Sequence, residues 1–133
     1  MFTYIGNNVS VVWTSNAQAI TSTGGVSTAT DISQAEGPII ITVAVPAGGS
    51  NTMTIGVTQS ELSGSGFAAV PAANLLNSSG VASTFATVST TASTQTLYLQ
   101  RVNSQRYLQL AYTGTALTQT VSALFAFIVK YTS

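Results

Sequence analysis

The chain has 133 residues, no cysteine, no histidine and a charged fraction of only 5%. This length predicts one domain, residues 1–133, with one hydrophobic core. The missing cysteine excludes disulfides and thiolate metal sites. Three lysine and arginine residues are too few for a phosphate-binding patch, so we expect no nucleic-acid partner.

The low charge also bears on what covers the surface. The formal net charge is zero, whereas roughly a quarter of the residues in an average soluble domain are charged. Lysine, glutamate and aspartate are depleted in the cores of protein interfaces. The composition therefore favours a surface that is largely covered by partner proteins over one that is merely neutral.

Membrane insertion is not expected. The longest apolar runs, 38–45 and 121–129, are shorter than the ~18–20 residues that a membrane-spanning helix needs. The first residues lack the basic segment of a secretory signal. We therefore expect neither a membrane partner nor a leader.

The N-terminal third has the weakest pattern. Phe2, Tyr4 and Ile5, followed by Val9–Thr14, indicate two short strands or an extended arm within residues 1–29. Residues 22–28 have the composition of a loop. Because this loop would give the apolar segment 1–14 reach, we expect the segment to pack partly across a subunit boundary. An ordinary first strand within the same subunit is the alternative.

The middle of the chain predicts two strands. Residues 38–45 form a continuous apolar run, which indicates a strand buried on both faces. Residues 52–58 alternate between apolar residues and threonine, or glycine at one position, which indicates a strand with one face in the core. The turn-forming residues 46–51 between them predict a hairpin. Residues 59–83 are the least regular part, with 72–76 as the single candidate helical turn.

Three further strands are expected in the C-terminal part. They cover residues 97–100 and 106–112, and then, after a turn at Gly114, residues 119–131. The last strand is apolar on both faces, so it belongs in the middle of a sheet or at an edge covered by another subunit. The whole pattern predicts an all-β fold, an antiparallel jelly roll or β-sandwich of about eight strands. The expected core contains Ile40, Val43, Ile55, Val57, Leu97, Leu99, Leu108, Leu110, Phe125 and Phe127.

The residues for most enzyme chemistry are missing. Without histidine, neither a Ser-His-Asp triad nor the commonest general base is available. A Ser-Lys pair would need Lys130, which we interpret as a solvated charge at a strand end. The acids Asp31, Glu36 and Glu61 are too dispersed for a calcium loop. We therefore expect no enzyme activity, no cofactor and no bound metal.

Aromatic residues and one arginine are the remaining candidates for contacts. Trp13 with Tyr4 or Tyr107 could stack on a sugar, or each could lie in the core or an oligomer interface. Arg106 beside Tyr107 is either a solvated charge or an anchor to a neighbouring chain, where both residue types are enriched. The candidate inter-subunit or capsid contacts are Phe2, Tyr4, Trp13, Arg106 and Tyr107.

A resemblance to a known family rests on the segment 105–114, QRYLQLAYTG, which is followed by an apolar terminal strand. Upstream, Asp31-Ile32 precedes a strand that begins with Gly-Pro, and residues 53–60 run into a loop that ends at Phe67. Over about residues 30–131 the chain resembles the jelly-roll capsid cement (decoration) proteins of tailed bacteriophages, the family that includes the Bordetella phage cementing protein.

The resemblance implies a mechanical role. Such a protein would be a homo-oligomer, a dimer or trimer, on the outer surface of the virion. It would bind the major capsid protein and bridge neighbouring capsomers. Two alternatives remain open, namely another virion component of the tail or head–tail junction and a β-sandwich carbohydrate-binding module.

Overall fold

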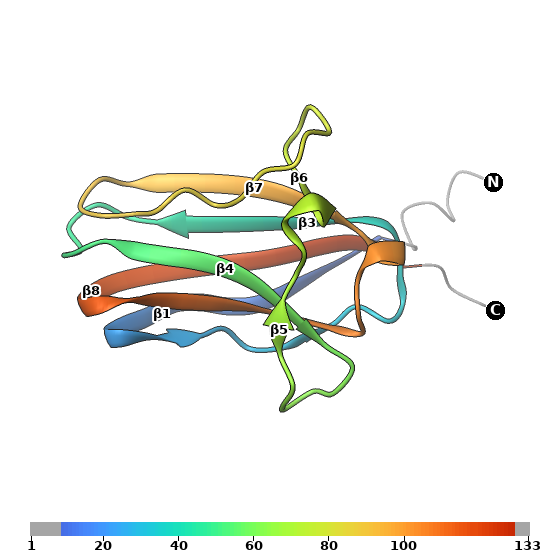
Figure 1. Cartoon of the computed structure of the whole chain (residues 1–133), viewed down its shortest axis with the longest axis horizontal. Coiled ribbons are helices and arrows are strands. Elements are labelled where there is room, and N and C mark those ends of the chain that lie inside the picture. The colour runs from blue at the N-terminus through green and yellow to red at the C-terminus, as the bar shows by residue number, and fades with distance from the viewer. Residues whose placement is uncertain (1–8, 130–133) are drawn as a thin grey trace.

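The computed structural model describes the backbone of residues 9–129 and the side chains of residues 18–128. It confirms the all-β class, because eight strands form one curled antiparallel sheet and account for 60% of the chain (Figure 1). The strands are β1 (Val9–Val26), β2 (Thr30–Asp31), β3 (Ala35–Val45), β4 (Met53–Ser60), β5 (Ala68–Ala69), β6 (Leu75–Leu76), β7 (Ser93–Gln100) and β8 (Tyr107–Val129). Two short 3₁₀ helices, η1 (Ala72–Asn74) and η2 (Arg101–Asn103), complete the described elements.

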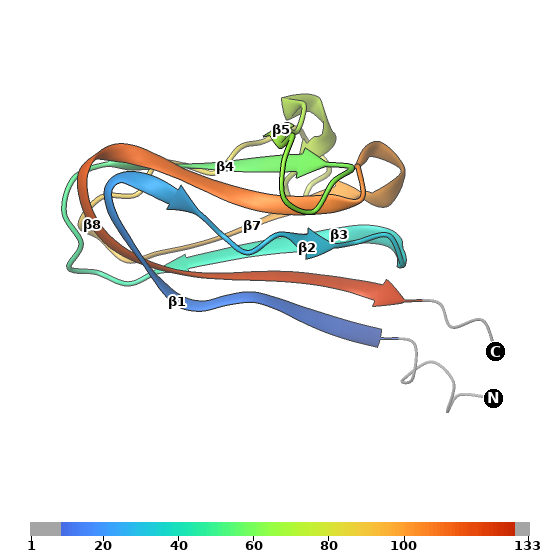
Figure 2. The same cartoon turned by 90° about the horizontal axis from the view of Figure 1, so that it is seen from below.

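The sheet curls into two layers because β8 belongs to both. Its first part pairs with β4 and with the end of β1, and its second part pairs with β3 and with the beginning of β1. Figure 2 shows β8 curving over from the layer of β4 to the layer of β3. We call these the β4 layer, which also contains β2 and β5, and the β3 layer, which also contains β6 and β7.

The core lies between the two layers and follows the period of two expected of strands. In β3 the residues Ile39, Ile41, Val43 and Val45 point inward and are at most 2% exposed. The inward residues of the other strands include Ile55 and Val57 of β4, Leu97 and Leu99 of β7, and Leu108, Leu110, Phe125 and Phe127 of β8. Nine of the ten residues expected in the core are therefore buried.

Ile40 is the exception, and its placement in the core was wrong. Its side chain is 38% exposed, because the inward phase of β3 falls on the odd-numbered residues. The expectation that residues 38–45 are buried on both faces was wrong for the same reason, since the second face is exposed or half-buried. A run that is apolar throughout does not reveal which phase faces inward.

The predicted hairpin between residues 38–45 and 52–58 was also wrong. β3 pairs with β7 and β8, whereas β4 pairs with β5 and β8. The turn after Val45 therefore carries the chain from one layer to the other. Both edges of β3 are already occupied, so β4 has no free backbone groups of β3 to pair with.

Residues 22–26 of the loop predicted at 22–28, and the turn predicted at Gly114, are parts of continuous strands instead, whereas residues 27 and 28 do lie outside the strands. β1 runs to Val26, and β8 runs from Tyr107 to Val129. The two strands bend together, with backbone angles of positive φ at Ser22, Gly24 and Ala116 and a register shift between Ser22 and Gly24. The helical turn expected at 72–76 is confirmed at 72–74, as η1, whereas residues 75–76 form β6.

A buried amide fastens the chain next to this bend. Gln119 of β8 is 3% exposed, and its Nε2 group donates hydrogen bonds to the carbonyl oxygens of Asn51 and Ser89, each at 3.0 Å. These acceptors belong to the β3–β4 turn and to the segment before β7. One side chain therefore holds two connections against the central strand.

At the bend β1 and β8 approach so closely that residue 24 has no room for a side chain. A Cβ atom there would overlap the carbonyl oxygen of Tyr112, and φ at this residue is +129°. We expect Gly24→Ala to lower the free energy of unfolding by at least ~2 kcal/mol, because steric overlap and backbone strain add. Gly56→Ala is the control, since a Cβ there has its nearest neighbour, the Ala111 carbonyl oxygen, at 3.9 Å. Urea unfolding of both variants checks this, and equal stability of the two would contradict the register at Gly24.

Tyr112 supplies a second prediction. Its side chain is 1% exposed, its hydroxyl group has no hydrogen-bond partner among the described residues, and burial raises its pKa well above the usual value of 10.0. We expect Tyr112→Phe to leave stability at pH 7 unchanged or to raise it by up to ~1–2 kcal/mol, because an unpaired buried hydroxyl is removed.

The alkaline pH dependence provides a separate check on Tyr112. Above the usual tyrosine pKa the unfolded chain releases a proton that folded Tyr112 retains, so wild-type stability falls as the pH rises. In Tyr112→Phe this contribution to the slope should disappear. A Phe variant that melts well below the wild type at pH 7 would show that the hydroxyl group has a partner.

Candidate functional site: the outer face of the β3 layer

The outward side of the β3 layer carries an apolar patch. Ile40 lies opposite Ala126 across the β3–β8 pair, and Thr42 lies opposite Leu124. Ile40 is 38% and Ile128 is 52% exposed, while Leu124 and Ala126 are half-buried. We call Ile40, Leu124, Ala126 and Ile128 the outer patch. β8 places three of the four on one face because, in the second part of this strand, the even-numbered residues share the side opposite the core.

Among the described residues, the surroundings of the outer patch are uncharged except at one margin. Thr42 and Thr96 join across β3 and β7 by a hydroxyl–hydroxyl hydrogen bond of 3.1 Å. Glu36 lies at the margin, opposite Ile128. The outer patch is therefore an exposed apolar surface with neutral hydroxyl groups beside it. Exposed apolar patches with polar rims are typical of surfaces that associate.

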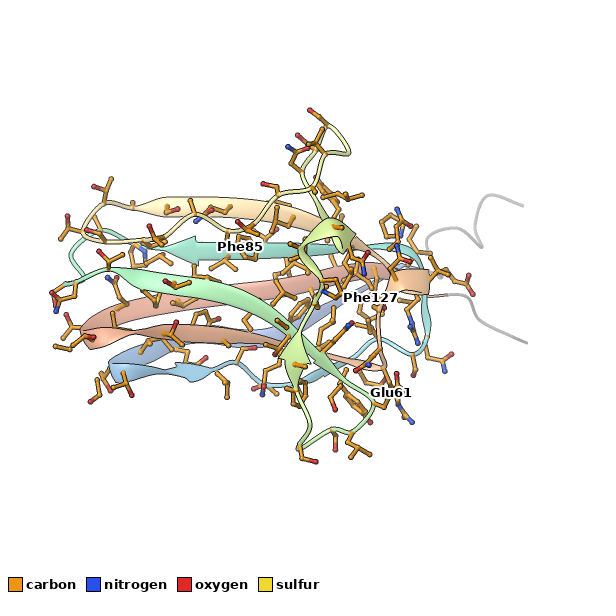
Figure 3. The ribbon with its side chains drawn as sticks, in the orientation of Figure 1. Glu61, Phe85 and Phe127 are labelled. Atoms are coloured by element: carbon orange, nitrogen blue, oxygen red, sulfur yellow. The ribbon has the colours of Figure 1, made fainter. Side chains whose placement is uncertain are left out.

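The charged residues of the described chain gather at one end of the sandwich. They are Asp31 of β2, Glu36 of β3, Glu61 after β4, Arg101 after β7 and Arg106 before β8. Figure 3 shows Glu61 at this end. The connections at the opposite end, where β8 bends, contain no charged residue among the described residues. The part of the molecule that the structure describes therefore has one ionic end and is otherwise neutral.

Arg106 and Tyr107, both expected as inter-subunit or capsid contacts, have side chains that contact each other. The Arg106 guanidinium group is over the Tyr107 ring, 5.2 Å from its centroid. However, Arg106 also binds Asp31 of the same chain, with Nη2 3.1 Å and Nε 3.3 Å from Oδ2. Both side chains are about half exposed. The arginine thus has an intramolecular partner, which joins β2 to β8.

The other expected contacts divide differently. Phe2 and Tyr4 lie outside the described residues, as does Lys130. Trp13 belongs to β1 at the register position opposite Leu124, and its side chain is likewise outside the described range. The backbone of 9–13 pairs with β8 of the same chain. That the segment 1–14 also packs partly across a subunit boundary stays a prediction.

Sequence reasoning missed both the outer patch and the Asp31–Arg106 pair. The patch had a signal, because residues 38–45 and 121–129 are apolar at both phases of the strand, and the spare phase had to be exposed or covered. The ion pair had no such signal, since its members are 75 residues apart.

The described residues were also compared with the requirements of metal sites and membrane-spanning helices. They contain no group of three or more His, Cys, Asp or Glu residues that could hold a metal ion. None of their helices has the length and apolar character to cross a membrane. Comparisons with protein-family models and with curated proteins each returned no match.

The ion pair predicts a weak acid dependence of stability. Burial of Asp31 opposes ionisation, but hydrogen bonds from Arg106 and Ser33 outweigh it and set the Asp31 pKa below the usual 3.8. A lowered carboxyl pKa stabilises the fold above the unfolded-state value and loses that effect as the pH falls through the folded-state value. We expect Arg106→Ala to raise the Asp31 pKa in an NMR titration, with little change of melting temperature at pH 7, since exposed pairs contribute little. An unchanged Asp31 pKa would contradict the ion pair.

Proposed function

We propose that this chain is a structural protein of a tailed-bacteriophage virion that binds the outer surface of the capsid and stabilises it by bridging capsomers. The resemblance of residues 30–131 to capsid cement proteins supplies the role. The observation that carries the proposal is the outer patch, an exposed apolar surface on a protein with almost no charge. Its occupant in this proposal is the major capsid protein.

The physical argument starts from solubility. A free protein normally remains dispersed through net charge, and this chain has none. Ile40 and Ile128 are well exposed in the isolated chain, and burying apolar area against a partner stabilises a complex by about 25 cal/mol per Å² before the costs of association. Covering such a face with a partner lowers the free energy, whereas leaving it in water raises it.

The free edge of β1 supports a second partner, another copy of the chain. Among the described strands β1 pairs only with β8, so its other edge is open. Residues 9–26 contain neither a charged residue nor proline, the two devices that commonly prevent strand edges from pairing. Pairing between two β1 edges would give the homo-oligomer that the cement-protein resemblance implies.

The direct test of the role is particle composition. In purified virions of the phage that encodes it, the chain should be present in fixed stoichiometry with the major capsid protein and accessible to labelling from outside. Presence in isolated tails, or absence from virions, would refute the capsid role.

The outer patch is tested by a matched pair of variants. Ile128→Glu places a charge in the patch, and Leu62→Glu places one on a residue that is 61% exposed in the segment after β4. We expect Ile128→Glu to weaken binding to undecorated heads by at least ~2 kcal/mol, roughly 30-fold in Kd, since a desolvated contact would acquire an unpaired charge. Leu62→Glu should bind as the wild type does.

Both variants should melt close to the wild type, because the substituted side chains are already in water. Binding is measured by co-sedimentation with heads. If the two variants occupied heads equally, the outer patch would not be the docking surface.

A further inference from the structure

A hollow of about 240 Å³ lies where the short strand β6 pairs with β7, beside the outer patch and separate from it. Its wall combines Tyr98 and Gln100 of β7, Pro38 of β3, and Leu76, Asn77 and Ser78 at and after β6. Figure 1 shows the segment after β6 projecting past β7 at the top of the view. Tyr98 lies between Ile40 and Leu76 in the register of the layer, so the tyrosine occupies the same outward face.

The segment after β6 is locked by its own hydrogen bonds. The backbone N–H of Asn77 donates to the Val81 carbonyl at 2.8 Å, and the Gly80 N–H donates to the Asn77 carbonyl at 3.0 Å. The Asn77 side-chain oxygen accepts from the N–H groups of Ser79 and Val81 at 2.9 and 3.1 Å. Because Oδ1 is held inside the turn, the orientation of the Nδ2 group is fixed as well. The rim of the hollow is therefore formed before any ligand arrives.

Several polar groups in the hollow have no hydrogen-bond partner among the described residues. The Tyr98 hydroxyl, the Gln100 amide, the Ser78 hydroxyl and Asn77 Nδ2 make no hydrogen bond to another described residue. Together they offer both donors and acceptors. Tyr98, Leu76 and Pro38 add apolar surface beside them. Amide and hydroxyl groups next to an aromatic ring match a ligand that has C–H faces as well as hydroxyl groups.

The charge of the hollow narrows the ligand class. None of its lining residues is charged, so an ionic ligand would lose hydration without gaining a counter-charge. The volume is below the roughly 300–1,000 Å³ of pockets for drug-sized ligands, which suits a single ring. We propose that this hollow is a binding site for a neutral saccharide, one sugar unit of which stacks on Tyr98 while the amides of Asn77 and Gln100 bind its hydroxyl groups.

This inference does not rest on the capsid role. From the sequence, the candidate residues for stacking on a sugar were Trp13 with Tyr4 or Tyr107. The aromatic residue that lines the hollow is instead Tyr98. On a virion, such a site would let the protein attach to neutral glycans of a cell surface or medium. The same site would be equally usable on a protein that never meets a capsid.

The test uses the full chain and a panel of neutral sugars, namely glucose, galactose, mannose, N-acetylglucosamine and N-acetylgalactosamine, with glucuronate as the charged comparison. Binding is followed by NMR shifts of the Tyr98 ring and of the Asn77 and Gln100 side-chain amides. We expect at least one neutral sugar to give saturable shifts confined to these groups, and glucuronate to bind more weakly.

Two variants and one control locate the site. Tyr98→Ala should weaken binding about tenfold or more by removing the stacking surface, and Gln100→Ala should weaken it several-fold. Gln105→Ala, also an exposed glutamine but not part of the hollow, should bind as the wild type does. If Tyr98→Ala does not fold, Gln100→Ala still decides the question, because its side chain is exposed.

Three results would overturn the saccharide site. These are the absence of shifts with every neutral sugar, shifts that persist unchanged in Gln100→Ala, and glucuronate binding as tight as that of the neutral sugars. Loss of head binding by Gln100→Ala together with no sugar binding would instead assign the hollow to the capsid contact. The three sugar-binding results do not depend on whether the chain is a cement protein, because the sugar titration needs no capsid.

Discussion

The antiparallel pair of β1 and β8 is the constraint on which the fold depends. β8 is 23 residues long and pairs with β4 and β2 in one layer and with β3 in the other, while β1 follows it through both layers. The two layers are therefore halves of one bent ladder. At the bend the backbones approach so closely that Gly24 has no room for a Cβ atom, and the Gln119 amide ties two neighbouring connections to β8.

This bend also determines the distribution of charge. Because β8 turns back at one end of the sandwich, its first and last residues lie together at the other end, where the charged residues collect. Asp31 and Arg106 pair there across β2 and β8. Among the described residues the bend end carries no charge, and the outer face of the β3 layer has Glu36 only at its margin. With only six charged residues, the protein can in this way have one well-hydrated end and still leave the outer face of the β3 layer available to associate.

The two proposed contacts use that face in chemically different ways. The outer patch has aliphatic side chains such as Ile40 and Ile128 and suits a dry protein interface. The hollow beside it has Tyr98 together with Asn77 Nδ2 and the Gln100 amide and suits a hydroxylated ligand. Ile40 and Tyr98 are cross-strand neighbours, so a partner on the patch would approach the rim of the hollow. Substitutions at Ile128 and Gln100 separate the two, because neither residue belongs to the other site.

The sequence by itself determined the class of fold and most of the core. Alternation in segments such as 53–57 and 108–110 favours one way to bury the apolar face, so residues such as Leu108 and Leu110 could be assigned to the core from the period of two alone. Where both phases of a strand are apolar, as around Ile40, the sequence is silent on which side faces inward. Only the tertiary structure decided that phase, the partners of β3 and the meeting of Asp31 with Arg106. Each of these depends on which distant strand pairs with a given edge. Every strand can make the same backbone hydrogen bonds, so the local sequence does not specify which partner it pairs with.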